Sequence, residues 1–279
     1  MFRQRSSTQH HRHNPFRNFV SNSEVMMLRR FRNLSHLSLV AVLLYLTGAT
    51  ALAQSGNFVI SQRGNPVGTA NFNFISTPHG YSSTSVVRLA MQGLDYALSK
   101  TESLSPDNRL RHVQLSAAVN GAAVNLTAAP DTAQFLINVS ADGHSSTTRL
   151  EFHPGTVFLP DFDPGALETL LALGVTRNNS QIWALIPRHS GSIEPIQLAT
   201  FADEQGTLDG KPIAVHHLVA TIGGAATDLF SGPENQLLQA ELPQRGFALI
   251  RKGFVLTPPA KPNAPPAAPA DAAPPPVLQ

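Results

Sequence analysis

The sequence predicts a mainly β protein, built as a large curved antiparallel meander with one short helix near residues 164–173. Between residues 56 and 256 nearly every apolar pattern has a period of two, and residues typical of tight hairpin turns separate the runs. Only the segment near 164–173 breaks this period. A sheet of about a dozen strands is too wide to remain flat, so we expect it to curl into an open barrel or half-barrel.

Composition already excludes several classes of function. Only 14% of the 279 residues are charged, against roughly 25% in typical soluble domains, and this low charge weighs against nucleic-acid binding. The sequence has no cysteine, which excludes disulfides, thiolate metal sites, a cysteine nucleophile and lipid attachment at a cysteine.

The first 53 residues have the organisation of an export signal preceded by an extension. Residues 1–26 are rich in Arg, His and Ser, and they are expected to be a disordered extension or the result of a mis-assigned start. Residues 27–53 contain a basic stretch, an apolar run at 37–46 and a small-x-small cleavage motif that ends at Ala53, the three regions of a signal peptide. The mature chain is then expected to begin at Gln54 and to be periplasmic or secreted.

An uncleaved membrane anchor is the alternative interpretation of the same segment. The apolar run has about ten residues, whereas a membrane-spanning helix needs ~20. No second apolar stretch of that length follows it. We therefore expect no transmembrane segment in the mature chain.

The basic character of the sequence belongs to this leader. Residues 1–53 contain seven of the 20 basic residues and one of the 18 acidic residues, which leaves the rest of the chain with a formal net charge of −4. The sequence pI of about 9.2 therefore does not indicate binding to nucleic acid or to anionic membranes.

Residues 257–279 form a Pro/Ala-rich segment with nine prolines and two charged residues. This composition cannot build a core and samples extended polyproline II, so a disordered tail is expected. Recognition of the tail by a groove-binding partner is the functional alternative. The β domain is accordingly placed at residues 54–256.

The first half of the β domain is expected to contain only strands. Turn signals separate them at Gly64–Pro66, Ser105–Asn108, Asn120–Gly121 and Asp142–Gly143. The expected strands include residues 58–62, 70–74, 94–98, 113–119, 124–126, 135–139 and 150–152. The alternation within 70–74 predicts that Phe72 and Phe74 face the core. The intervening Asn71 and Asn73 are then expected to face solvent.

The second half begins with the predicted helix. Asp163 suits the N-cap, Pro164 the first helical position and Gly174 the residue after the end. The leucines of this segment share one face, which must cover the sheet for so short a helix to be stable. Strand patterns resume at residues 181–186, 193–201, 213–222, 227–230, 236–242 and 247–256.

This order of features is similar to that of bacterial secreted proteins of unknown function with a curved antiparallel sheet. The residues that carry the similarity are the opening hairpin, with glycines at 64 and 68, and the stretches 208–212, 227–231 and 237–243. Over residues 57–256 the chain resembles the lipoprotein-carrier (LolA-like) proteins of the cell envelope. The resemblance implies an open-barrel architecture and an apolar ligand, and it brings no catalytic signature.

Three sets of residues could in principle carry chemistry, and each is better explained by its place in the predicted structure. The segment Gly143–Thr147 resembles a nucleophile elbow, but it lies in a turn between two strands rather than between a strand and a helix. His216 and His217 are adjacent in a predicted strand, so they point to opposite faces and cannot chelate one metal ion together. The acidic residues near the helix lack the spacing of a calcium loop: Asp161, Asp163 and Glu168. We therefore expect no catalytic residues, no metal site and no cofactor.

Two classes of function follow from this organisation. The first is a noncatalytic exported envelope protein that binds an apolar or lipid-like ligand in the curved sheet. The alternative is a structural or protein-interaction module without a small-molecule ligand, whose partner is an envelope protein. A hydrolase is a third option, for which the sequence singles out no residues, and the sequence does not identify ligand-binding residues either.

We predict that the exported protein begins at Gln54, because the small residues before it match the cleavage site of a signal peptidase. N-terminal sequencing of the protein recovered from the periplasm or the medium checks this position. Peptides from residues 1–53 in the exported protein would contradict both the start-site and the cleavage interpretations.

Overall fold

The computed structural model describes residues 54–176, 181–188, 191–242 and 246–258. The predicted extension, the predicted signal peptide and almost all of the predicted tail lie outside the described residues. In the described part of the chain no helix is long and apolar enough to cross a membrane.

The described chain is mainly β, as the sequence predicts, and its strands form one large curved sheet that does not close. The strands are β1 (Ser55–Gln62), β2 (Asn65–Thr77), β3 (Gly80–Met91), β4 (Leu94–Leu104), β5 (Leu110–Val119), β6 (Ala122–Asp131), β7 (Gln134–Ala141), β8 (His144–Glu151), β9 (Thr156–Phe158), β10 (Ile182–Ile186), β11 (Ser192–Thr200), β12 (Glu204–Leu208), β13 (Lys211–Ile222), β14 (Ala225–Ser231), β15 (Leu237–Leu242), β16 (Phe247–Arg251) and β17 (Phe254–Leu256). The described helices are α2 (Pro164–Thr176) and a short 3₁₀ helix, η1 (Pro233–Asn235).

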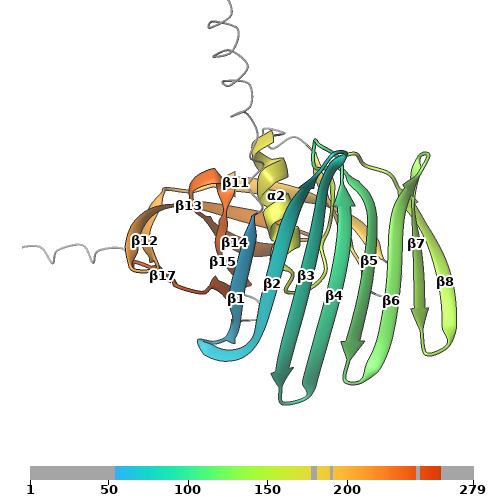
Figure 1. The fold of residues 1–279 in the computed structure, drawn as a ribbon, viewed down its shortest axis with the longest axis horizontal. Coiled ribbons are helices and arrows are strands. Elements are labelled where there is room, and N and C mark those ends of the chain that lie inside the picture. Colours follow the sequence, from blue (N-terminus) through green and yellow to red (C-terminus); the bar gives the residue numbers. More distant parts are fainter. Residues whose placement is uncertain (1–53, 177–180, 189–190, 243–245, 259–279) are drawn as a thin grey trace, which may run out of the picture. The chain divides into compact units, whose positions relative to one another are not determined.

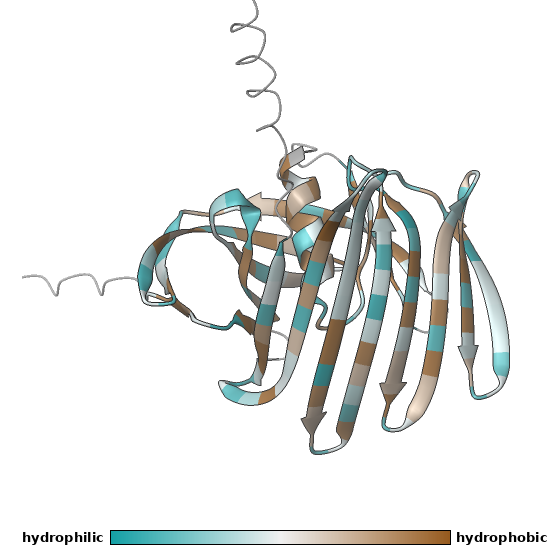
Figure 2. Ribbon diagram, in the orientation of Figure 1, coloured by the Kyte–Doolittle hydropathy of each residue, from teal (hydrophilic) through white to brown (hydrophobic). Residues whose placement is uncertain are grey.

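Strands β1 to β8 form a continuous antiparallel meander in which each strand pairs with the next. Figure 1 shows this meander as the strands coloured from blue to yellow-green. Hydrophobic and hydrophilic residues alternate along these strands, visible as brown and teal bands in Figure 2. The turns confirm the sequence signals, since Asn120 and Gly121 have φ values of 50° and 84°, the positive values that a type I′ hairpin turn requires.

The second half of the chain returns to the first strand. β9 runs parallel to β10, and β10, β11, β13, β14, β15 and β16 are antiparallel neighbours in that order. β16 pairs with one edge of β1 and β2 with the other, so β1 joins the two halves of the sheet. β12 pairs with both β13 and β17. A small second apolar cluster lies among β13, β14, β15 and β17 and consists of Val215, Phe230, Leu238 and Phe254.

The main core lies between the meander and the elements that pack on one of its sides. We call this side the inner face, and it carries the buried residues Ala70, Phe72, Val87, Leu98, Leu115 and Leu126. Helix α2 packs against β2, β3, β9, β10 and β15. The alternation predicted for β2 is confirmed at Phe72, which is buried, and at Asn71, which is exposed, whereas Asn73 and Phe74 are both partly buried and Phe74 packs against the core.

The helix begins as predicted but ends later than predicted. The Asp163 side chain accepts hydrogen bonds from the backbone N–H groups of Gly165 (2.9 Å) and Ala166 (3.3 Å), which makes it the N-cap. Gly174 does not stop the helix, which continues to Thr176. A Cβ atom at Gly174 would lie 3.0 Å from Leu198 Cδ1, so glycine here allows the helix to approach β11 closely.

Several strand assignments differ from the sequence expectation, and the short strands β9 and β12 were not expected at all. No strand was expected between residues 75 and 93, where β3 lies, because two consecutive inner positions are Ser83 and Ser85 and the apolar alternation is lost there. The first hairpin turns at Arg63 and Gly64, one residue earlier than predicted. The single strand expected at 247–256 is divided into β16 and β17 by a turn.

The confirmed register of β2 gives a stability prediction. Phe72→Asp places an unpaired carboxylate in a site with 2% exposure, so it should cost several kcal/mol and unfold the domain. Asn71→Asp changes an exposed neighbour and should stay within about ±0.5 kcal/mol. Urea unfolding of the two variants measures the difference, and a destabilised Asn71→Asp beside a tolerated Phe72→Asp would mean that β2 is shifted by one residue.

Candidate functional site

The inner face of β4 to β7 contains a cavity of about 350 Å³, which we call the sheet cavity. Leu98, Ala117, Val124 and Ala141 are successive cross-strand partners on these four strands and line it. The next row of the same face holds larger side chains, Leu115, Leu126 and Val139. The hollow therefore lies where small residues replace leucine on the inner face.

The sheet cavity is bordered by both buried and exposed groups. Leu98 and Leu126 are buried, whereas Val119, at the end of β5, is 40% exposed and also lines the cavity. The cavity thus opens to solvent beside Val119. On the side away from the sheet it is bordered by residues 159–161 and 187–188.

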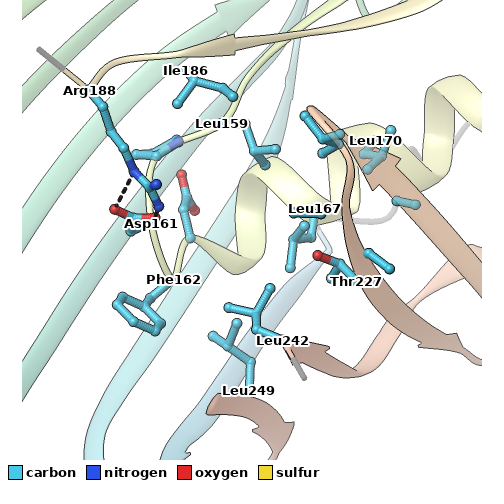
Figure 3. Close-up of a pocket in the computed structure, with 16 residues that line it drawn as sticks. Leu159, Asp161, Phe162, Leu167, Leu170, Ile186, Arg188, Thr227, Leu242 and Leu249 are labelled. Atoms are coloured by element: carbon cyan, nitrogen blue, oxygen red, sulfur yellow. Dashed lines mark hydrogen bonds and ion pairs between the residues drawn. The ribbon is translucent and has the colours of Figure 1, made fainter. Parts of the chain in front are cut away.

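A second cavity of about 180 Å³ lies beside α2, and we call it the helix cavity. Figure 3 shows Leu159, Leu167 and Leu170 facing it from the segment before α2 and from α2 itself. Leu242 and Leu249 line it from β15 and β16. The helix cavity is therefore also mainly aliphatic.

Four residues line both cavities and separate them: Leu159, Pro160, Asp161 and Arg188. The guanidinium of Arg188 holds the carboxylate of Asp161 with two hydrogen bonds, one of them from Nε to Oδ2 at 3.2 Å. This hydrogen bonding raises the pKa of Arg188 above its usual value. The pair is half-exposed, with 46% of the Arg188 side chain and 38% of the Asp161 side chain accessible.

We call the Asp161–Arg188 pair between the two cavities the polar boundary, and the phenol of Tyr96 lies beside it. Its hydroxyl donates to the backbone carbonyl of Asp161 at 3.4 Å, and its ring meets the ring of Phe162 edge-on at 6.1 Å. Burial, followed by the nearby carboxylates of Asp161 and Asp163, raises the pKa of Tyr96 above its usual value. The phenol therefore stays protonated and is a hydrogen-bond donor.

A fully buried charge cluster lies beneath the start of α2. Lys100 Nζ on β4 is 2.6 Å from Asp163 Oδ2 and 3.0 Å from Glu102 Oε2, and all three side chains have no exposed surface. Because Asp163 caps α2 through Oδ1 and meets Lys100 through Oδ2, one carboxylate joins the helix to the sheet. Burial raises the pKa of Glu102, and Lys100 only partly offsets this shift.

The same cluster brings a serine opposite a lysine, an arrangement that a hydrolase could use. Ser85 is the cross-strand partner of Lys100, and its hydroxyl has no hydrogen-bond partner among the described residues. Burial lowers the pKa of Lys100, but Asp163 and Glu102 together raise it above its usual value. The ammonium therefore keeps its proton and cannot act as a base toward Ser85.

Glu168 forms a second buried link between α2 and the sheet. Its Oε2 accepts a hydrogen bond from the backbone N–H of Leu237 on β15 at 2.6 Å. Burial raises the pKa of Glu168 to about 7, although the Leu237 N–H and Arg251 act in the opposite direction. Glu168 therefore titrates near neutral pH in the folded protein.

The acidic residues considered for calcium do not converge. Asp161 binds Arg188, Asp163 binds Lys100, and Glu168 binds a backbone N–H. Within the described ranges no group of three or more His, Cys, Asp and Glu residues is placed to hold a metal ion. Gly143 lies in the turn between β7 and β8 rather than before a helix, as the sequence analysis expected.

The adjacent histidines lie in different surroundings. His216 is exposed, with Nδ1 2.9 Å from Asp203. His217 lies between the rings of Phe201 and Phe230, at 5.1 and 4.6 Å, and its Nε2 is 2.9 Å from Asp228. The two imidazoles therefore do not form a common site.

Comparison of the chain with protein-family models, with curated proteins and with solved structures found no match. The resemblance to the LolA-like carriers accordingly stays a prediction.

The raised pKa of Glu168 predicts a pH-dependent stability. Its pKa falls from about 7 in the folded chain to about 4.5 on unfolding, so the folded state binds the proton more tightly. The free energy of unfolding should therefore decrease as the pH rises from about 4.5 to about 7, by about 3 kcal/mol, and the Glu168 contribution should then level off. Glu168→Gln keeps an acceptor for Leu237 N–H without the titration, and should lose this decrease.

Urea unfolding of the wild type and the variant between pH 4.5 and 8 measures this difference. Glu151→Gln is the matched control, because 80% of the Glu151 side chain is exposed. Parallel pH profiles for the wild type and Glu168→Gln would show that the carboxyl group is not titrated near neutral pH.

Proposed function

We propose that this chain is a noncatalytic, exported envelope protein that binds an apolar or lipid-like ligand in the sheet cavity. The observation that carries the proposal is an aliphatic cavity of about 350 Å³ on the inner face of the sheet, open beside Val119. Small-molecule sites typically occupy roughly 300–1,000 Å³ and are lined mainly by apolar groups. The sheet cavity has the size and the chemistry of such a site.

The position of the cavity supports a binding role over a packing defect. Protein interiors are filled to the density of organic crystals, so a hollow of this size costs van der Waals contacts. Ala117 and Ala141 occupy inner positions where the adjacent row carries Leu115 and Val139. Larger residues at these two positions would fill the space, and the sequence retains small ones.

The interaction module, the alternative in the sequence analysis, requires an inner face filled by side chains. Between β4 and β7 the inner face is not filled by side chains, because the sheet cavity lies there. The N-terminal leader supports export, and it lies outside the described residues. Of the two hypotheses, the carrier therefore has the stronger support.

A matched pair of substitutions tests the carrier. Ala117 lines the cavity, whereas Ala118 is its neighbour on the opposite face of β5, and both are partly buried. Ala117→Phe should fill the hollow and weaken binding of a fluorescent fatty acid by at least about tenfold, equivalent to roughly 1.4 kcal/mol. Ala118→Phe adds the same ring outside the cavity and should leave binding within about twofold.

Fluorescence titration measures both affinities, and circular dichroism confirms that each variant is folded. Native mass spectrometry of the wild type, purified from its host, examines whether a lipid is already bound. A wild-type protein that takes up no fatty acid and carries no lipid would contradict the carrier hypothesis.

A further inference from the structure

We propose that the sheet cavity selects a single-chain amphiphile with a zwitterionic head group, in which a phosphate binds Arg188 and an ammonium binds Asp161. This inference rests on the proposed function and adds the chemistry of the head group. It starts from the place of the Asp161–Arg188 pair. The only charged side chains among the described lining residues of the sheet cavity belong to this pair.

The exposure of the pair makes its partners exchangeable. Both side chains reach water, with 46% of Arg188 and 38% of Asp161 exposed. Ion pairs of this exposure contribute little to stability, because solvent screens them and both side chains lose conformational freedom. A ligand with two suitable charges can therefore separate the pair and bind both members without leaving a buried charge unpaired.

The sum of charges at the boundary decides between head groups. Arg188 and Asp161, the charged pair that lines the sheet cavity, are together neutral. A purely anionic head at Arg188 would stand beside the Asp161 carboxylate, and a purely cationic head at Asp161 would stand beside the guanidinium. A zwitterion matches both, and its net charge of zero matches the boundary.

The shapes of the polar groups assign the two ends of the head. The guanidinium is a planar fork of donors that suits the oxygens of a phosphate. The Asp161 carboxylate accepts hydrogen bonds from a primary ammonium. Tyr96, which also lines the cavity, donates its O–H to the Asp161 backbone carbonyl and so lies beside the pair. Both charged groups of the pair thus have a partner in one phosphoethanolamine head.

The aliphatic side chains that line the sheet cavity bind the alkyl chain of the ligand. They begin directly beside the ion pair, because Leu98 and Ala117 line the same cavity as Arg188. A volume of about 350 Å³ is at the lower end of small-molecule sites, which favours one alkyl chain over two. A lysophosphatidylethanolamine has this combination of one chain and a zwitterionic head.

The experiment compares three ligands with the same acyl chain, each below its micelle concentration. Lysophosphatidylethanolamine is zwitterionic, lysophosphatidylglycerol is anionic and monoacylglycerol is uncharged. Each displaces an uncharged fluorescent probe from the full chain, and the displacement gives its affinity. We expect lysophosphatidylethanolamine to bind at least about tenfold more tightly than the other two. Added salt should reduce this preference without weakening monoacylglycerol.

Two variants assign the preference to the ion pair. Arg188→Gln should remove the preference, so that lysophosphatidylethanolamine binds no more tightly than monoacylglycerol. Asp161→Asn leaves Arg188 as the charge at the boundary and should shift the preference toward lysophosphatidylglycerol. Arg149→Gln is the matched control, because Arg149 is exposed on β8, and it should change nothing. The salt titration needs no variant, so the test survives if a variant does not fold.

The outcomes separate this inference from the proposed function. Equal affinities for the three ligands, or a wild-type preference for lysophosphatidylglycerol, would overturn the zwitterion while the carrier stands. Binding to phosphatidylcholine vesicles with no binding of monomeric lipid would move the head-group contact to a membrane surface and also overturn it. If none of the three ligands binds, the proposed function itself fails.

Discussion

The contact on which the rest of the structure depends is the buried ion pair between Asp163 and Lys100. Asp163 caps α2 through one oxygen and binds the sheet through the other, so the start of the helix has one position over β4. The preceding segment, residues 159–162, is held by the same anchor and separates the two cavities. Moving this contact would therefore move the helix, the segment 159–162 and the polar boundary together.

A buried ion cluster is weak evidence for stability, because removing charges from water costs about as much as their attraction returns. Its value here is positional. The aliphatic face of α2 could slide over an aliphatic sheet with little change in buried area, whereas a lysine between two carboxylates accepts one register. Glu168 adds a second fixed point, since its carboxylate binds the backbone of β15. Together the two contacts hold the helix at both the meander and the returning strands.

The sequence predicts the meander because period two and the hairpin turns are local signals. The register of β2 follows from Phe72 and Asn71, and the N-cap follows from Asp163 alone. β3 is not predicted because two of its inner positions are Ser83 and Ser85, which lie opposite Glu102 and Lys100. Serines rather than apolar residues stand opposite the two charged side chains. The lost apolar pattern of β3 and the buried charge cluster therefore have the same cause.

The site is less predictable than the strands. Lys100 and Glu102 alternate in step with Leu98 and Leu104, and charged residues at inner positions were a signal for a buried pair. The pairing of Arg188 with Asp161 carries no such signal. It depends on β10 returning parallel to β9, a contact between segments that no turn links.

The two cavities show why the anchor and the hollow are on different parts of the inner face. On β4, Lys100 and Glu102 lie under α2, whereas Leu98 lies one inner position away and lines the sheet cavity. The helix thus covers the charges, which must be kept from water to hold one register, and leaves the row with Ala117 and Ala141 uncovered. A hollow between β4 and β7 can then be empty or filled without disturbing the contact that orients the helix. The half-exposed Asp161–Arg188 pair lies between these regions, where its partners can change while the buried cluster stays fixed.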